Sequence, residues 1–300
     1  MRTWGLSAII RAMSLQVECA VRGADLLGEC PLWDGRELWW VDILGPALKR
    51  LDPASGKPRA LALPEPIGSF AFRRAGGVLA AMKLGLYFLN PDDGALENIA
   101  QPEAGLAQNR FNDGRCDRDG RFWAGTMKDE GKREPVGSLY RLDAGAACTR
   151  VRGELYVPNG LSWSPDGRTM YFSDTHRHVV WAYAYDRASG AISSQRVFAE
   201  ASDLHPDGAC VDAEGCLWSC QYGGWRIVRY TPAGKIDRVL ELPVANPTCC
   251  CFGGEALDTL YVTTATQKLA PDELARQPLA GSLLALRPGV KGLPESRFAS

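Results

Sequence analysis

The stretch GECPLWDG, residues 28–35, leads into LWWVD, residues 38–42, and together they contain the unit on which the whole chain is built. The second piece is typical of a buried strand, because aromatic and β-branched residues follow an Asp-Gly turn. The first piece places a carboxylate, Glu29, at the mouth of the strand before that turn. The rest of the chain repeats this layout with other residues at the position of Glu29, and those substitutions indicate the function.

Six copies of the strand at 38–42 occur along the chain, at 38–42, 78–82, 121–125, 169–174, 216–219 and 259–263. Aligned on their central residues, they are separated by 41, 43, 48, 47 and 43 residues. Repeats of this length with strand signals only indicate a β-propeller. A third strand follows in each copy, at 49–53, 87–91, 139–143, 181–186, 227–232 and 283–288. The remaining residues fit a fourth strand, so the sequence predicts an all-β, six-bladed propeller of four-stranded antiparallel blades.

The predicted domain boundaries leave a short extension before the propeller. Residues 1–14 form an N-terminal extension without fixed structure, since their apolar piece at 6–10 is shorter than the roughly 7–15 residues of a signal peptide. Residues 15–300 form one propeller domain, in which the strand at 15–21 completes the last blade. Residues 271–276 begin with proline and predict a short helix in a loop of the sixth unit.

Composition excludes several classes of partner. A formal net charge of −1 provides no basic face for nucleic acid or an anionic membrane. No run approaches 18 apolar residues, so we expect no membrane span. The ten cysteines are irregularly spaced, three of them consecutive at 249–251. Without a secretory leader, free thiols in a reducing cytoplasm are the expectation. No obligate protein partner is indicated.

A position shared by four of the repeats carries polar side chains. Counting back 10 to 12 residues from the centre of the repeated strand gives Glu29, Asn112, Asn159 and Asp207. The second and sixth units supply only Gly68 and the region 248–249. In a propeller these positions face the central channel, so two carboxylates and two amides are expected to meet there.

Two carboxylates in a narrow channel repel each other unless a cation compensates them. Oxygen-only ligands select a hard divalent ion, Ca²⁺, Mg²⁺ or Mn²⁺, and the three histidines show no paired spacing for zinc. The alternative is structural, because Asn-Gly and Asp-Gly are common turn dipeptides. The shared repeat position favours a metal site in the central channel.

Four motifs also resemble a known family. GECPLW at 28–33, RFNDG at 110–114 with AGTM at 124–127, PNGLSWSPDG at 158–167, and PDG at 206–208 with DAEG at 212–215 resemble the senescence-marker-protein/regucalcin/gluconolactonase family. The resemblance runs in order from about residue 26 to residue 286. The segment from 251–254 to 263–265, together with 278–281, resembles the bacterial sugar-lactonase branch in particular.

The resemblance implies a metal-dependent hydrolase that opens aldonolactones, of the gluconolactonase, xylonolactonase or arabinonolactonase type, to aldonic acids. It implies one divalent ion, Ca²⁺ first, with Mg²⁺, Mn²⁺, Zn²⁺ and Fe²⁺ open. It assigns the ion to Glu29, Asn159 and Asp207, the general base to Asp207, and the binding of sugar hydroxyls to Arg110, Asn112 and Glu130.

Two other functions fit the same fold. One is a hydrolase of another ester or of an organophosphate at the same site, for which an apolar channel lining is expected. The other is a non-catalytic calcium-binding propeller, which gives no reason for two acids at corresponding channel positions. A serine hydrolase is disfavoured, because no Gly-x-Ser-x-Gly sequence occurs. Fold alone does not choose among these functions.

Overall fold

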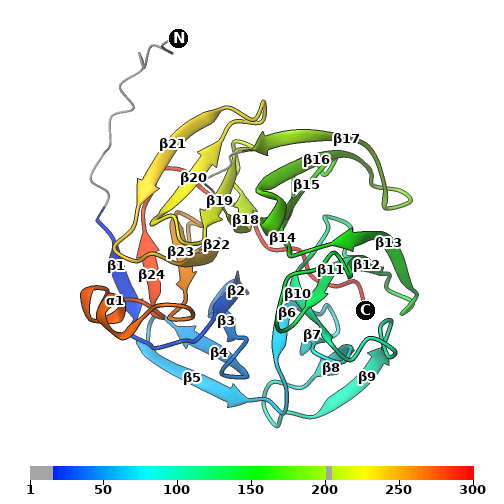
Figure 1. Ribbon diagram of the computed structural model, residues 1–300, viewed down its shortest axis with the longest axis horizontal. Helices are drawn as coiled ribbons and strands as arrows, with labels where there is room; N and C mark the ends of the chain where they lie inside the picture. Colours follow the sequence, from blue (N-terminus) through cyan, green and yellow to red (C-terminus); the bar gives the residue numbers. More distant parts are fainter. Residues whose placement is uncertain (1–15, 201–204) are drawn as a thin grey trace.

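Six four-stranded antiparallel sheets surround a central axis in the computed structural model of the protein, which describes residues 16–200 and 205–300 (Figure 1). The predicted six-bladed β-propeller is therefore confirmed. In each blade the strand order follows the chain from the innermost strand outward, apart from the last blade. The extension predicted at residues 1–14 lies outside the described residues.

The strands have the following bounds. Blade 1 consists of β2 (Gly28–Trp33), β3 (Leu38–Asp42), β4 (Ala47–Asp52) and β5 (Lys57–Ala62), and blade 2 of β6 (Ile67–Phe72), β7 (Val78–Met82), β8 (Leu86–Leu89) and β9 (Leu96–Ala100). Blade 3 consists of β10 (Asn109–Cys116), β11 (Phe122–Lys128), β12 (Gly137–Leu142) and β13 (Cys148–Leu155). Blade 4 consists of β14 (Pro158–Trp163), β15 (Thr169–Asp174), β16 (Val179–Asp186) and β17 (Ala191–Glu200), with the 3₁₀ turn η1 (Thr175–Arg177) between β15 and β16. Blade 5 consists of β18 (Pro206–Val211), β19 (Leu217–Gln221), β20 (Arg226–Tyr230) and β21 (Ile236–Glu241), and blade 6 of β22 (Pro247–Gly253), β23 (Thr259–Thr264), β24 (Leu283–Leu286) and β1 (Glu18–Val21).

The first strand of the chain closes the ring. β1 pairs antiparallel with β24, with Glu18 opposite Ala285 and Cys19 opposite Leu284. The strand predicted at 15–21 thus completes the last blade as expected, within the residues that the structure describes. Blade 6 therefore joins the first and the last strand of the chain in one sheet.

The apolar core consists of layers between neighbouring blades. Trp39 packs in the layer between blades 1 and 2, whereas Trp40 packs in the layer between blades 6 and 1. Successive side chains of a strand point to opposite faces, and both faces of a blade are covered. This is why LWWVD at 38–42 is an uninterrupted apolar run rather than an alternating one.

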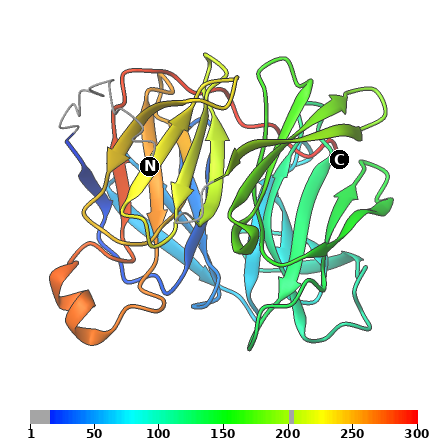
Figure 2. The same cartoon turned by 45° about the horizontal axis from the view of Figure 1, so that its top comes forward.

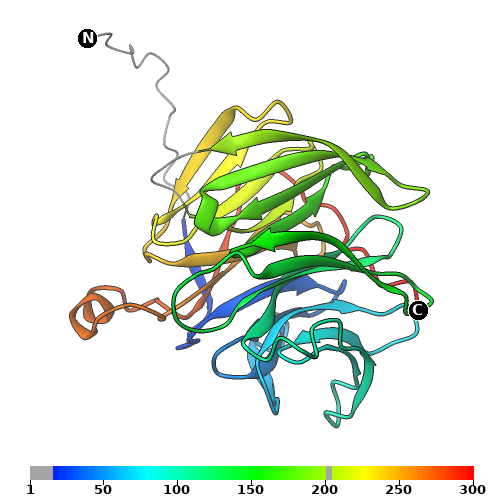
Figure 3. The ribbon, with the colours of Figure 1, turned by 45° about the vertical axis from the view of Figure 1, so that its right-hand side comes forward.

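The two ends of the propeller carry different segments. The predicted helix is present as α1 (Pro271–Arg276) and protrudes from one end of the sheets, while the segment after β24 crosses the opposite end (Figures 2 and 3). This C-terminal segment is hydrogen-bonded to blades 2 and 3: the amide of Phe298 donates to Phe72 O at 2.8 Å, and that of Ala299 to Gly120 O at 3.0 Å.

The ten cysteines are all free thiols, and eight of them are buried. In the described part of the chain, no helix has the length and apolar character that spanning a bilayer requires.

Candidate functional site

The innermost strands are irregular near their beginnings, and this irregularity positions the predicted site residues. The pairing register shifts in β2 between Glu29 and Leu32, in β10 between Phe111 and Gly114, in β14 between Asn159 and Ser162, and in β18 between Pro206 and Ala209. A bulge of this kind breaks the alternation of side chains and redirects one of them. Each predicted channel residue lies at or inside such a shift.

The backbone conformation at two of these bulges is left-handed. Cys30, directly after Glu29, has φ 48°, and Gly160, directly after Asn159, has φ 64°. Glycine adopts this conformation without strain, whereas a residue with a Cβ does not. Blades 1 and 4 thus share the same local geometry, and Cys30 holds it at a conformational cost that Gly160 avoids.

One cavity of about 210 Å³ opens at this end of the channel. Glu29, Arg110, Asn112, Asn159 and Asp207 all line it, and all are buried. The structure therefore brings together five of the six residues that the sequence singled out. Their individual chemical roles stay predictions.

A chain of hydrogen bonds links the side chains from three blades. Arg110 Nη1 donates to Asn112 Oδ1 at 2.8 Å, and Asn112 Nδ2 donates to Asn159 Oδ1 at 2.9 Å. Asn159 Nδ2 in turn donates to Asp207 Oδ1 at 2.7 Å and to Thr175 Oγ1 at 2.7 Å. Each amide is held from both sides, so the oxygen atoms at the floor of the cavity have defined positions.

In the ion-free protein, burial and neighbouring negative charges destabilise the ionised forms of the two carboxylates at the cavity floor. Burial raises the pKa of Glu29 to about 8, and the charge of Asp113 adds to the shift. Burial also raises the pKa of Asp207 well above its ordinary value, with the charge of Glu29 as the next cause. Among the described residues, neither carboxylate has an ion-pair partner within 4.0 Å. The floor is therefore a place where a cation would relieve repulsion.

Two charged residues of β10 were missed by the repeat argument. Asp113 accepts a hydrogen bond from the amide of Leu161 at 2.9 Å and raises the pKa of Glu29. Arg115 donates Nη1 to Ala209 O at 2.7 Å, farther along the channel. Asp113 is part of the RFNDG motif, but Asn112 occupies the shared repeat position, so the repeat argument did not single out Asp113.

Glu130 is the one predicted site residue that the structure does not bring to the cavity, and its placement is a correction. Glu130 is exposed and does not line the cavity, whereas Met127 does. Alternation along β11 puts Asp129, not Glu130, on the same side as Met127. Asp129 accordingly accepts a hydrogen bond from Arg110 Nε at 2.9 Å and pairs with Lys83 at 2.7 Å.

The rim of the cavity comes from loops that have no fixed place in the repeat. Its polar and charged members are Arg133, Thr175, His176, His205, Tyr222, Gln267 and Lys268. Of these, only His205 had attracted notice in the sequence, because it precedes Pro206 at the mouth of the channel. Loop residues follow no strand periodicity, so the sequence held no signal for the others.

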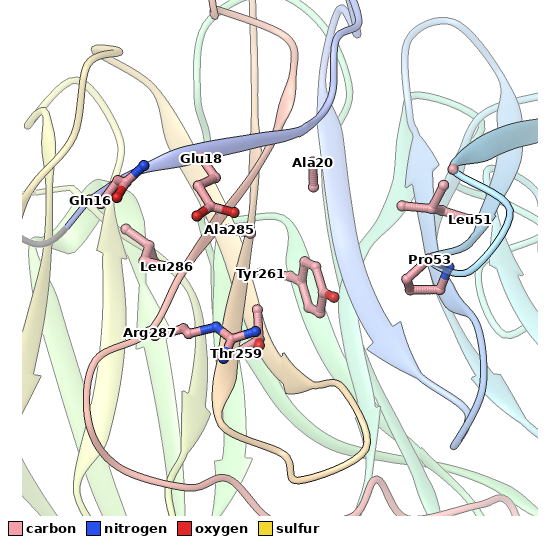
Figure 4. A pocket seen from close by; sticks show the side chains of 11 residues that line it. Gln16, Glu18, Ala20, Leu51, Pro53, Thr259, Tyr261, Ala285, Leu286 and Arg287 are labelled. Atoms are coloured by element: carbon pink, nitrogen blue, oxygen red, sulfur yellow. The ribbon is translucent and has the colours of Figure 1, made fainter.

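Two other features of the described residues do not form a comparable site. Asp212 and Glu214 lie beside Cys216, but Arg229 already pairs with both acids, at 2.7 and 2.6 Å. A larger hollow of about 460 Å³ lies where blade 6 meets blade 1, lined by β1, β23, β24 and the end of β4 (Figure 4). It contains none of the predicted site residues.

Comparison with known proteins gives a consistent result. The family model described as SMP-30/Gluconolactonase/LRE-like region matches residues 27–266. The chain is 42% identical to a 6-deoxy-6-sulfogluconolactonase from Pseudomonas putida, over 96% of this chain and 100% of that protein. It is 37% identical to regucalcin from Gallus gallus, over 95% of this chain and 99% of that protein.

A solved structure shows the same architecture. The calcium-binding protein regucalcin from Agrobacterium tumefaciens superimposes with a TM-score of 0.90 at 30% identity. The match covers 95% of this chain and 98% of that chain. The similarity thus spans all six blades and the site described above.

Proposed function

Since the chain belongs to the SMP-30/gluconolactonase/LRE-like family, we propose that it is a sugar lactonase that hydrolyses aldonolactones to aldonic acids. One observation carries the proposal: two buried carboxylates, Glu29 and Asp207, face a small polar cavity without an ion-pair partner among the described residues. The Pseudomonas putida relative is named for a sulfonated gluconolactone, which leaves the substituent on the terminal carbon as the variable part of the substrate.

The donor set fits a hard divalent cation. In the described part of the chain, Glu29 Oε1 and Asp207 Oδ2 have no hydrogen-bond partner, and the amide oxygen of Asn159 keeps a second lone pair beside its bond from Asn112. Two carboxylates balance the charge of such an ion, and oxygen donors favour Ca²⁺, Mg²⁺ or Mn²⁺ over Zn²⁺ or Fe²⁺. We assign the ion to Glu29, Asn159 and Asp207, with Ca²⁺ as the first choice.

The ion, when bound, would polarise the lactone carbonyl as a Lewis acid. The chain supplies the proton transfers. Asp207 accepts a proton from the water that attacks the carbonyl carbon. The bond from the carbonyl carbon to the ring oxygen then breaks, and the ring oxygen takes the proton from Asp207 and leaves as a hydroxyl group. One water is consumed, and the product is a hydroxy acid.

Arg110 and Asn112 are proposed to bind the sugar hydroxyls. Among the described residues, Arg110 Nη2 has no partner, while its Nε and Nη1 are fixed by Asp129 and Asn112. A guanidinium held in this way presents a donor in a defined direction. The polar lining of the cavity also favours a polyol over an aryl ester, for which apolar walls are expected.

The test is an ion and substrate panel. Protein stripped of metal is supplied again with Ca²⁺, Mg²⁺, Mn²⁺, Zn²⁺ or Fe²⁺ and assayed on several aldonolactones by acid release, with the spontaneous hydrolysis of each lactone subtracted. We expect turnover to return with a hard divalent ion. Ion binding without turnover of any lactone would support the calcium-binding propeller instead. An aryl ester and an organophosphate are assayed in parallel, and turnover of these without turnover of any lactone would support the other hydrolase.

A further inference from the structure

The cavity has an acidic floor and a cationic rim. Its carboxylates, Glu29 and Asp207, both lie at the floor, and no other described residue that lines it is acidic. The rim holds Arg133 from blade 3 and Lys268 from blade 6, with His176 and His205 from blades 4 and 5. The two kinds of charge are thus separated along the axis of the propeller.

Arg133 has no ion-pair partner among the described residues. Its Nη1 donates to the carbonyl oxygens of Lys128 and Asp129, and no carboxylate of the described residues lies within 4.0 Å of its guanidinium. The carboxylate of Asp129 is already occupied by Arg110 and Lys83. Arg133 is therefore held by main-chain oxygens and not by a carboxylate, and it is partly removed from water.

Lys268 extends the positive rim on the opposite blade. Its Nζ lies 5.7 Å from the centre of the Tyr222 ring, and in the described part of the chain no carboxylate pairs with it. The preceding residue is anchored, because Gln267 O accepts hydrogen bonds from Tyr222 Oη at 3.1 Å and from Asn246 Nδ2 at 3.0 Å. Lys268 has φ 64°, a strained conformation for a residue with a side chain, and such strain concentrates at functional positions.

The positively charged side chains of the rim, Arg133 and Lys268, have no role in the proposed hydrolysis of a neutral lactone. Under the proposed function, on which this inference rests, the two floor carboxylates are balanced by a divalent ion. Arg133 and Lys268 then keep their positive charge at the more exposed edge of the cavity, where no described carboxylate pairs with either of them. The exocyclic chain of an aldonolactone is carried by the ring carbon bonded to the ring oxygen, and it points away from the ring in a different direction from the carbonyl oxygen. A substrate bound with its carbonyl oxygen at the floor therefore leaves that chain free to extend toward the rim.

We propose that the preferred substrate is a monosaccharide lactone with an anionic group on its terminal carbon, bound by Arg133 and Lys268. A sulfonate, a phosphate ester and a carboxylate share the required chemistry, because each presents oxygen acceptors to a guanidinium and an ammonium group. The cavity of about 210 Å³ suits a single sugar unit, since it is smaller than the roughly 300–1,000 Å³ of drug-sized sites.

The experiment compares lactones that differ only at this carbon. The metal-loaded protein is assayed on gluconolactone, its 6-phosphate, the 6-deoxy-6-sulfo analogue and the analogue with a terminal carboxylate. We expect kcat/KM to be at least about tenfold higher for one or more anionic lactones than for the neutral one, the usual size of a charge-assisted contact. Raising the salt from about 0.05 M to about 0.5 M should reduce this ratio.

Variants locate the effect. Arg133→Gln should lower the anionic-to-neutral ratio of kcat/KM by at least about tenfold, and Lys268→Gln by about threefold or more, because Lys268 is exposed and screened. Lys132→Gln, an exposed cation in the same loop that does not line the cavity, should leave the ratio unchanged. Melting temperatures check that each variant is folded.

Different results would overturn the proposed anion site and the proposed lactonase function. Equal kcat/KM for neutral and anionic lactones in the wild-type protein would overturn the anion site while lactonase activity stands. A wild-type preference that survives in both Arg133→Gln and Lys268→Gln would overturn the assignment to these residues. No turnover of any lactone would overturn the proposed function itself.

Discussion

At Glu29 the chain buries a carboxylate whose one hydrogen bond among the described residues comes from the amide of Cys30, at 2.9 Å. Asp207 is equally buried and receives one bond, from Asn159. Burying a charge without a partner is costly, and the raised pKa values of both groups express that cost. These two carboxylates therefore lower the stability of the folded, ion-free protein. A bound cation would remove this destabilisation.

Replacing either acid should separate activity from stability. Glu29→Gln and Asp207→Asn keep the shape but remove the charge, so each should lower kcat by at least about 10², the range for loss of a general base or of charge stabilisation. In the ion-free state both variants should melt at a higher temperature than the wild type, because the repulsion is gone. Kinetics and calorimetry test the pair of effects, and near-wild-type kcat would remove the residue from the mechanism.

The pKa of Glu29 predicts how stability depends on pH. Its folded-state pKa of about 8 lies above the ordinary glutamate pKa of 4.5, so between these pH values the folded state binds more protons than the unfolded state. Stability contributed by protonated Glu29 is then full below about pH 4.5 and is lost as the pH rises toward 8. The melting temperature of the ion-free protein should accordingly fall over this pH range, by roughly 2–4 °C for each kcal/mol of unfolding free energy that is lost.

Glu29→Gln provides the control for this pH dependence. The variant should melt with a shallower fall between pH 4.5 and pH 8, since the glutamine does not titrate. Saturating divalent ion should flatten the wild-type curve in the same way, because the ion stabilises the ionised form. A wild-type curve that rises over the window, or one that the substitution does not change, would contradict the interpretation.

The bulges of the innermost strands are the elements that turn a repeated sheet into a site. A regular strand would place alternate side chains against the neighbouring blades and leave none aimed along the axis. In β14 the bulge depends on Gly160, where an added Cβ would lie 2.6 Å from Ser173 Oγ and 3.2 Å from Asp207 O. Gly160 therefore sets the distance between Asn159 and the strand that carries Asp207.

Gly160→Ala should thus lower both stability and activity. The positive φ and the close contacts together should cost roughly 1–3 kcal/mol, measured by urea unfolding. The shift of Asn159 should lower kcat/KM by about tenfold or more, because small displacements in a site are costly. Gly56→Ala is the matched control: φ is also positive, at 62°, but a Cβ there meets nothing within 4 Å.

The control isolates backbone strain from crowding. Gly56 lies in the β4–β5 hairpin, away from the cavity, so Gly56→Ala should lose some stability and keep its turnover. Equal effects of the two substitutions on kcat/KM would show that the contacts of Gly160 do not position the site.

The sequence predicts elements well where a residue's environment repeats. The strands at 38–42, 78–82 and 169–174 coincide with β3, β7 and β15, because each has the same layers on both faces. The same regularity located the four polar channel residues. Glu130 was misplaced because the register after β11 decides which of two adjacent acids faces inward. Arg133 and Lys268 were not foreseen, since they lie in loops whose course is set by tertiary contacts.

At the scale of the whole molecule, a second closure accompanies the pairing of β1 with β24. The C-terminal segment leaves blade 6 and ends against blades 2 and 3, where the fully buried side chain of Phe298 joins their shared core layer. Arg74 N donates to Phe298 O at 3.0 Å. The segment therefore connects blades that are distant in sequence and resists opening of the ring.

Phe298→Ala should weaken this closure. Truncation of a fully buried phenylalanine costs about 3–5 kcal/mol, so the midpoint of urea unfolding should fall clearly. Lys291→Ala, an exposed position in the same segment, should change the unfolding free energy by no more than about 0.5 kcal/mol. A loss at Phe298 as small as that at Lys291 would show that the segment is only loosely attached.

The same segment also governs passage through the molecule. Residues 293–295 lie against the far ends of β10, β14 and β18 and leave a space of about 20 Å³ there, about enough for one water molecule. In the described part of the chain, molecules of sugar size therefore reach the cavity through the opening at its other end, beside Gln267 and Lys268. Reactant and product must use it in turn, so an accumulating acid occupies the path of the next lactone.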